Sequence, residues 1–406
     1  MSAKVAEAGV RGRKVRSDLW TKVEPAGSGG LEIELQSKVE IMYGDSIRRQ
    51  LRKGLETLGI ENAKLQVEDA GALPYCIDAR LEAAARRALP DLDKRILPDE
   101  PKPRSESRRD RFRRSRLYLP GNSPKLFPNS GLHGADALIL DLEDAVAPTE
   151  KDAARILVRN ALLSLDFGEA ERMVRINQGE RGLDDLGEII PCPVQLILIP
   201  KVESAEDVRI VDEKIREISA ECGREESVWL MPIIESSAGV LASLEIARAS
   251  GNIVALAIGL EDYTADIGVP RTEEGRESLW MRSQIINSCR TTGIQAIDTV
   301  YSDVANEEGL RESVREAKAL GFDGKGCIHP RQIRVVHETF APSKEELEKA
   351  CRVVLAFEDA EAQGLGVVSL GSKMIDAPVV KRAQHTVDLA IAMNLLNEQW
   401  RREDPS

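Results

Sequence analysis

Short runs of aliphatic residues recur along the last three-quarters of this chain, and most of them end in a charged or titratable residue. The runs lie at 114–120, 135–144, 172–177, 195–203, 228–235, 253–262 and 324–329, and an eighth at 294–303 carries acidic residues inside and just after it. Runs this apolar predict strands buried on both faces, which is typical of a parallel sheet. Helix-like stretches separate the runs, and the clearest lie at 150–165, 204–218, 237–249, 271–292 and 309–320. Eight such strands alternating with helices predict an α/β fold, the (β/α)8 TIM barrel.

The residues at the ends of these runs predict one shared site. In a (β/α)8 barrel the C-terminal ends of the strands meet at a single mouth, where active sites lie. The residues expected to converge there are Asp141, Glu143, Asp144, Arg175, Glu203, Glu235, Asp262 and His329. This expected convergence of residues that are distant in sequence indicates an enzyme.

The composition excludes several classes of protein. The 406 residues fit a barrel plus a smaller domain, and the net charge of −12 argues against nucleic acid as a partner. The 6 cysteines are scattered without a CxxC pair, so we expect no disulfide framework, no zinc site and a cytoplasmic protein. No apolar run approaches the ~20 residues of a membrane span, and the N-terminus lacks the apolar region of a signal peptide.

The regions outside the barrel have their own patterns. We expect a small α+β domain over 1–90, a charged and proline-rich linker over 91–112, the barrel over 113–340 and a C-terminal helical extension and lid over 341–406. Within the first domain, the alternation predicts a hairpin over 17–36, helices over 38–58 and 76–89, and a strand at 65–69. The basic end of the linker is interpreted as a solvated tether, with an electrostatic dock for an anionic partner or a phosphate-bearing cofactor as the alternative.

Glu235 and Asp262 follow neighbouring strands and indicate a magnesium site. Two carboxylates with room for water suit Mg²⁺, although ion pairs at the barrel mouth are an alternative. Arg175 can bind a substrate carboxylate with two hydrogen bonds, or pair with Asp141, Glu143 or Asp144, and both can hold at once.

Three further residues are candidates with weaker signals. Lys201 can face a ligand, whereas His329 is expected to be a packed, hydrogen-bonded residue. Asp376 lies in a Gly-rich segment beyond the barrel, where it can serve as a general acid/base on a lid or as the N-cap of the last helix. From the residues alone, the N-cap interpretation is favoured.

Read together, several segments of the chain resemble the citrate lyase β-subunit family, to which malyl-CoA and citramalyl-CoA lyases are related. They are RRSRLYLPGN (113–122), LILDLEDAV (138–146), VRIN (174–177), PKVES (200–204), IIESSAGV (233–240), GLEDYTADIG (259–268), QAIDTVY (295–301), GKGCIHPRQI (324–333) and GSKMIDAP (371–378). The resemblance implies a barrel with a C-terminal lid, often trimeric, with Mg²⁺ on Glu235 and Asp262. It implies that Arg175 binds an oxaloacetate-like group and that Asp376 of an adjacent subunit is the acid/base. We also expect Arg114, Asp141 and Glu143 to contact the substrate.

The first domain resembles the citrate lyase acyl carrier protein, the γ-subunit. The segments that carry the likeness are AEAG (6–9), YGDSIRRQLRKGLETLGI (43–60), LQVEDAGAL (65–73) and CIDARLEAAARRA (76–88). In that family a serine two residues before an aspartate carries a phosphoribosyl-dephospho-CoA arm. Here Arg16 stands two residues before Asp18, and Ser17 is one place off. Either Ser17 carries the arm or this domain is unmodified.

The resemblance implies a Mg²⁺-dependent retro-aldol cleavage of a citryl thioester to oxaloacetate and an acetyl thioester. The alternatives are a malyl-CoA or citramalyl-CoA lyase, a thioesterase for such compounds, or a first domain that only docks the chain into a lyase complex. The expected partners are a small thioester substrate, further copies of the chain and a citrate lyase α (transferase) subunit.

Overall fold

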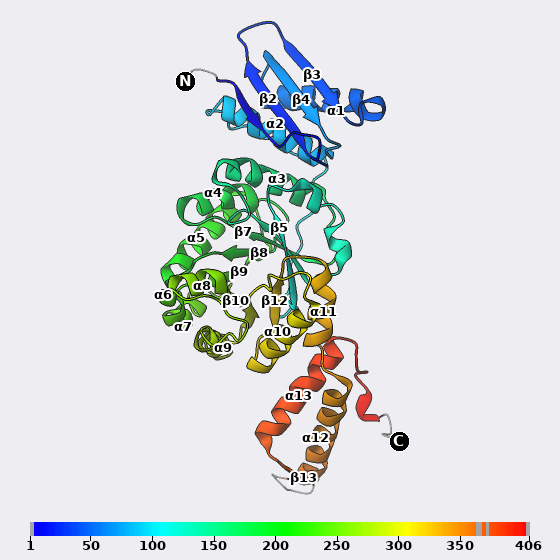
Figure 1. Cartoon of the computed structure of the whole chain (residues 1–406), viewed down its shortest axis with the longest axis vertical. Helices are drawn as coiled ribbons and strands as arrows, with labels where there is room; N and C mark the ends of the chain where they lie inside the picture. Colours follow the sequence, from blue (N-terminus) through cyan, green and yellow to red (C-terminus); the bar gives the residue numbers. More distant parts are fainter. Residues whose placement is uncertain (1–3, 363–367, 371–372, 403–406) are drawn as a thin grey trace. The chain divides into compact units, whose positions relative to one another are not determined.

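The computed structural model describes residues 4–362, 368–370 and 373–402. The chain divides into two compact units, of which the first ends at Ile333 and the second begins at Arg334. Figure 1 shows the elements of both units. Within the described ranges, no helix has the length and apolar character needed to cross a bilayer.

The described residues of the first unit form the expected closed barrel of eight parallel strands (Figure 1). The strands are β5 (Ser115–Pro120), β6 (Ala137–Asp141), β7 (Glu171–Arg175), β8 (Leu196–Ile199), β9 (Trp229–Ile234), β10 (Ala255–Ile258), β11 (Gln295–Asp298) and β12 (Gly324–Cys327). The ring closes where β12 pairs with β5, with Cys327 opposite Leu117. The aliphatic runs of the sequence correspond to these strands, so the predicted fold is confirmed.

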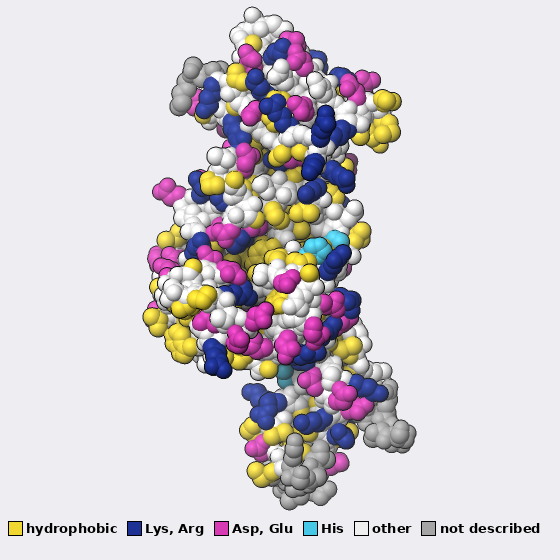
Figure 2. All heavy atoms as spheres, viewed as in Figure 1, with side chains coloured by type: hydrophobic (Ala, Val, Ile, Leu, Met, Phe, Trp, Pro, Cys, Tyr) yellow, Lys and Arg dark blue, Asp and Glu magenta, His cyan; other side chains and the backbone are white. Residues whose placement is uncertain are grey.

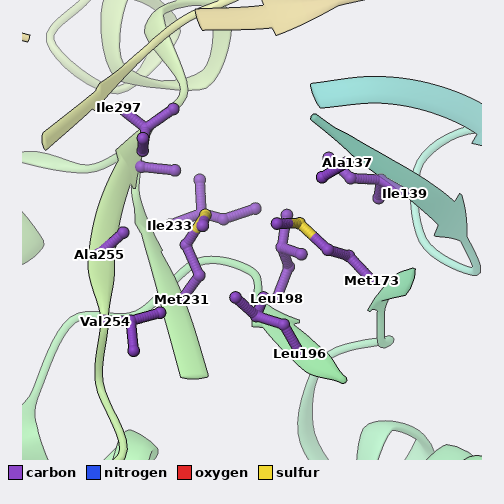
Figure 3. Close-up of a cluster of buried hydrophobic side chains, with 11 residues drawn as sticks. Ala137, Ile139, Met173, Leu196, Leu198, Met231, Ile233, Val254, Ala255 and Ile297 are labelled. Atoms are coloured by element: carbon purple, nitrogen blue, oxygen red, sulfur yellow. The ribbon is translucent and has the colours of Figure 1, made fainter. Parts of the chain in front are cut away.

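The barrel interior is a packed aliphatic core. Alternate side chains of neighbouring strands, including Ile139, Met173, Leu198 and Ile233, meet at the centre and are almost fully buried (Figure 3). On the face shown in Figure 2 the barrel is hollowed near its centre, with hydrophobic side chains at the floor and charged ones around it. Polar residues at the strand ends therefore lie above an apolar floor.

Helices surround the barrel, and two of them differ from expectation. They are α3 (Lys151–Ser164), α4 (Gly179–Ile189), α5 (Ala205–Glu221), α6 (Ser237–Leu241), α7 (Ser243–Ala247), α8 (Leu260–Asp266), α9 (Leu279–Thr292) and α10 (Glu307–Leu320). The next helix, α11 (Arg331–Phe340), begins in the first unit and ends in the second. The single helix expected over 237–249 is broken into α6 and α7 at Ala242. The helix expected from residue 271 begins only at Leu279, because Gly275 adopts a left-handed conformation (φ 61°) within the preceding turn.

The N-terminal domain is a four-stranded sheet with two helices. Its elements are β1 (Ala6–Ala8), β2 (Leu19–Pro25), β3 (Leu31–Ser37), α1 (Glu40–Leu58), β4 (Ala63–Asp69) and α2 (Pro74–Ala88). The hairpin predicted over 17–36 is wrong, because β4 lies between β2 and β3 in the sheet. Alternate residues of β4 are buried, and a strand that pairs on both sides satisfies more backbone groups than an edge strand. β4 is antiparallel to β2 and parallel to β3.

The N-terminal domain packs on the barrel through α2 and α3, with buried charges between them. Arg159 of α3 donates to Glu82 of α2 at 2.6 Å and to Glu188 at 2.8 Å, and all three side chains are nearly inaccessible to solvent. The backbone N–H of Ile96 also donates to Glu82, at 2.6 Å. A buried carboxylate with several donors is stabilised in its charged form, so this cluster ties α2, α3 and the linker together.

The linker crosses the N-terminal end of the barrel rather than extending into solvent. Arg104 donates to the carbonyl of Pro191 at 3.2 Å, and Arg109 donates to that of Gly251 at 2.6 Å. The buried Arg113 pairs with Glu171 at 2.7 Å. The solvated-tether interpretation is therefore wrong for these arginines, which close the end of the barrel opposite its mouth.

The second unit contains two long helices that pack on each other. Its elements are α12 (Lys344–Ala362), β13 (Val368–Leu370), β14 (Lys373–Ile375), α13 (Ala377–Ala392) and the short 3-10 helix Trp400–Arg402. Ser343 and Glu346 form a capping box at the start of α12, with reciprocal hydrogen bonds 2.9 and 3.1 Å long. Val354, Val387 and Trp400 belong to the core of this unit.

Candidate active site

Arg175, at the C-terminal end of β7, is held in the mouth by three carboxylates. Its Nε and Nη2 donate to the two oxygens of Asp141 at 2.7 and 2.6 Å. Nη1 contacts Glu143 at 2.8 Å and Asp144 at 3.2 Å. Asp141 therefore fixes the guanidinium plane, while Nη1 is the part of the group that a substrate carboxylate can reach by displacing the partly exposed Asp144.

Glu143 lies on the loop after β6 and links several polar groups of the mouth. It accepts from the side-chain amide of Gln178 at 2.8 Å. Burial raises the pKa of Glu143, and the neighbouring Arg175 partly offsets this shift. A cation bound nearby would stabilise the charged form of Glu143, because it would offset the cost of burying that charge.

Glu235, directly after β9, is a buried carboxylate held from two sides. One oxygen accepts from the backbone N–H of Lys201 at 2.7 Å. A Cβ built on Gly259 would lie 2.4 Å from the other oxygen and 2.9 Å from the Cβ of Glu235, so only glycine fits beside it. Burial is the main reason that the pKa of Glu235 is raised to about 7; the hydrogen bond from Lys201 opposes this rise, and the nearby charge of Asp262 adds to it.

Lys201 connects the two halves of the mouth. Its Nζ lies 3.4 Å from Asp262 and 3.8 Å from Glu143, while its backbone N–H binds Glu235. Lys201 adopts a left-handed conformation, φ 50°, which costs an L-residue roughly 1 kcal/mol. This conformation accompanies the orientation of the N–H toward Glu235, so the strain serves the site.

The carboxylates of the mouth fit a hard divalent cation. Asp262 and Glu143 lie 3.4 and 3.8 Å from the Nζ of Lys201, and Glu235 accepts from its backbone N–H at 2.7 Å, so the three carboxylates gather around one residue. The donors are oxygens, the ligands that Mg²⁺ prefers, and Mg²⁺ keeps several waters and so needs few protein ligands. Among the described residues, no group of three or more His, Cys, Asp or Glu side chains is arranged as a complete metal site.

Other candidates lie away from this cluster. Arg114 stands before β5, at the end of the barrel opposite the mouth, and pairs with Asp136 at 2.8 Å. This corrects the expectation that Arg114 binds substrate. His329 is a hydrogen-bonded residue, whose Nδ1 accepts from the N–H of Arg331 at 3.2 Å.

Asp376 is the N-cap of α13 in the second unit. Its carboxylate accepts from the N–H of Val379 at 3.2 Å. A carboxylate that caps a helix by accepting a hydrogen bond can still exchange a proton, so the structural role of Asp376 is compatible with a catalytic one.

Ser17 precedes β2 and has an unusual backbone conformation. Its φ is 55°, and its N–H donates to the carbonyl of Ala70 at 3.0 Å. The next residue, Asp18, is buried and pairs with Arg80 at 2.9 Å. The Ser17 hydroxyl is half-buried and makes no hydrogen bond within the described part of the chain.

Two residues of the mouth carried no clear sequence signal. Tyr118 packs in the barrel interior, and the guanidinium of Arg175 lies 5.5 Å from its ring centre. Its inward position follows only once the strand register is known. Gly259 was part of a quoted motif, but its role depends on contact with Glu235, which no spacing reveals.

Comparisons with known proteins match both parts of the first unit. The profile of the HpcH/HpaI aldolase/citrate lyase family matches residues 114–330, and the profile described as malonate decarboxylase delta subunit matches residues 5–88. Citrate lyase subunit beta of Haemophilus influenzae is 44% identical over 283 residues, 69% of this chain and 97% of that protein. Mitochondrial citramalyl-CoA lyase of Mus musculus is 35% identical over 69% of this chain and 87% of that protein. Among solved structures, CitE of Mycobacterium tuberculosis in complex with magnesium, acetoacetate and coenzyme A is 31% identical with a TM-score of 0.58, covering 70% of this chain and 99% of that one.

Proposed function

Because this chain belongs to the HpcH/HpaI aldolase/citrate lyase family and is a carbon–carbon lyase, we propose that it cleaves a citryl thioester into oxaloacetate and an acetyl thioester, with Mg²⁺ as cofactor. The observation that carries this proposal is the convergence of Glu235 and Asp262 on Lys201, close to Arg175. A citryl group suits a mouth with one arginine for a carboxylate and oxygen ligands for a cation. The identity of 44% to a citrate lyase subunit, against 35% to a citramalyl-CoA lyase, favours citryl over citramalyl.

Each group in the mouth has a distinct part in this reaction. Glu235 and Asp262 would hold the magnesium ion. When bound, the ion supplies Lewis-acid stabilisation of negative charge on the substrate oxygens. Arg175 binds a substrate carboxylate through Nη1 while Asp141 keeps the guanidinium oriented, so the scissile bond is presented in one geometry.

Asp376 is the proposed acid/base. Its ionised carboxylate takes the proton of the substrate hydroxyl, the carbon–carbon bond breaks, and the electron pair passes to the thioester enolate. Asp376 then returns the same proton to the enolate carbon, so protons and electrons balance. We propose that a neighbouring copy in a homo-oligomer supplies Asp376, with the C-terminal helices acting as a lid.

A substrate panel tests the proposal. Citryl-CoA, citramalyl-CoA and malyl-CoA are each assayed with Mg²⁺, and with EDTA as the metal-free control. We expect citryl-CoA to have the highest kcat/KM and Glu235→Ala to abolish turnover while leaving the fold intact. An active, Mg²⁺-independent Glu235→Ala variant would refute the metal assignment. A higher kcat/KM for citramalyl-CoA or malyl-CoA would show that this thioester, and not citryl-CoA, is the preferred substrate.

The role of the first domain is a second question. Its match to a carrier-type subunit supports two proposals: an arm attached at Ser17, or an unmodified domain that docks the chain to a transferase α-subunit. Intact-mass spectrometry separates them, because a phosphoribosyl-dephospho-CoA arm adds a large, defined increment that Ser17→Ala removes.

A further inference from the structure

The loop between β1 and β2 gathers positive charge in an acidic protein. Residues Gly9–Ser17 contain Arg11, Arg13, Lys14 and Arg16, whose side chains are exposed, whereas the whole chain has a net charge of −12. Lys38 adds a fifth cation, because its Nζ donates to the carbonyls of Val15 at 2.8 Å and Arg13 at 3.5 Å. We refer to these five residues as the basic loop cluster.

Most of this charge is not neutralised within the protein. Arg11 stacks on Trp20 at 4.3 Å and lies 3.5 Å from Glu68. Over the described ranges, Arg13, Lys14 and Arg16 form no ion pair. Three exposed cations on one short loop repel each other. An anion with several negative charges would be attracted by all three and would reduce this repulsion when it binds.

The loop is connected at both ends to the barrel mouth. Before it, the carbonyl of Glu7 accepts from Arg87 at 2.7 Å, and Arg87 also donates to the carbonyl of Thr149 at 2.8 Å. Thr149 follows β6 at the mouth. The basic loop cluster therefore belongs to a segment that is anchored at the rim where Glu143 and Asp144 lie.

The second connection leads toward the substrate arginine. After the loop, Asp18 pairs with Arg80, whose Nη2 donates to the carbonyl of Asn122 at 3.2 Å. Next to Asn122, the N–H of Gly121 donates to the carbonyl of Asp141 at 2.7 Å. Asp141 in turn holds Arg175, so the loop and the acyl site are linked by contiguous contacts.

We propose that the basic loop cluster binds the phosphate groups of the CoA-type thioester whose acyl end is held in the barrel. This inference rests on the proposed function, because it needs a thioester substrate in the mouth. Phosphates are the anions that clustered Arg and Lys side chains recognise best. They have two possible sources, a free CoA thioester or an arm attached at Ser17, which lies at the end of the same loop.

Binding of CoA itself to the full-length protein tests the site without relying on turnover. Isothermal titration compares wild type with Arg13→Glu/Arg16→Glu at low ionic strength, using CoA and phosphate-free pantetheine as probes. Arg49→Glu/Arg52→Glu is the matched control, because both arginines are exposed on α1 of the same domain and the change in charge is equal. We expect the loop variant to weaken CoA binding by roughly tenfold or more, and the control by less than about threefold.

The outcomes separate the two phosphate sources and the proposed function. If intact mass shows no arm and only the loop variant loses CoA affinity, with pantetheine binding unchanged, free CoA is the ligand. If the mass shows an arm, the loop variant should lower turnover of the arm-linked citryl substrate and leave turnover of added citryl-pantetheine, which has no phosphate, unchanged. Equal CoA affinity or turnover in loop and control variants overturns the inference. If the wild-type protein cleaves none of the panel thioesters and the loop variant still loses CoA affinity, the proposed function is wrong but the phosphate site is supported.

Discussion

Replacing Gly259 by alanine tests the active site without changing any charge. The added Cβ would lie 2.4 Å from Oε2 of Glu235 and 2.9 Å from its Cβ. Rotation of the carboxylate can relieve the first contact, but no side-chain rotation moves the Cβ of Glu235. The backbone after β9 or β10 must therefore shift, which costs about 1–3 kcal/mol of stability. A displacement of about 1 Å at a reacting group lowers turnover by roughly 100-fold.

The assay is lyase turnover with Mg²⁺ together with thermal unfolding. Gly187→Ala is the control, because an added Cβ on this α4 residue meets nothing within 4 Å. We expect the control to keep full activity and to be as stable as wild type or up to about 1 kcal/mol more stable, since alanine favours helix. If Gly259→Ala retained kcat/KM within about threefold of wild type, the position of Glu235 would not matter for the reaction and the proposed metal site would be wrong.

Variants at three further positions test other parts of the structure. Burial raises the pKa of Asp78 from 3.8 to about 6, so the free energy of unfolding should fall by up to about 3 kcal/mol as the pH rises from 4 to 6. Urea unfolding of Asp78→Asn should lack this fall and show a higher free energy of unfolding than wild type at pH 7.5. Arg159→Met removes a partner of the buried Glu82 and should cost about 3 kcal/mol in urea unfolding, whereas a loss below 1 kcal/mol would mean that Arg86 suffices. Asp376→Asn keeps a capping residue and should preserve the melting temperature while lowering turnover about 10²–10⁴-fold. Asp376→Ala should lose turnover and, in addition, about 1 kcal/mol of stability. Normal turnover in the Asn variant would exclude proton transfer by Asp376.

The barrel was predictable because its strands are local, apolar and regularly spaced. Runs such as LILD (138–141) are buried on both faces, and this requirement is visible in the residues themselves. The N-terminal sheet was less predictable, because β2 and β3 alternate as a hairpin would. Only the long-range pairing of Leu65 and Val67 with both strands shows that β4 separates them.

The active site was predictable only as far as the strand ends. Asp141 and Arg175 are the last residues of their strands, and Glu235 directly follows its strand. The fold brings them to one mouth as expected, because the C-terminal ends of all barrel strands meet there. Arg114 was expected to contact the substrate although it precedes its strand, and the structure places it at the other end of the barrel. The left-handed backbone of Lys201 accompanies a contact with Glu235 on the neighbouring strand end, and the sequence does not display this contact.

The buried cluster of Arg159, Glu82 and Glu188 has a consequence for how the two parts of this polypeptide work. Subunits that associate reversibly separate on dilution, and their joint activity then depends on protein concentration. Here the peptide chain and the ionic cluster keep one carrier-like domain beside each barrel at a fixed one-to-one ratio, whatever the amount of protein in the cell. For a domain that delivers a thioester to the mouth, this cluster predicts movement of the thioester or of short loops rather than of the whole domain.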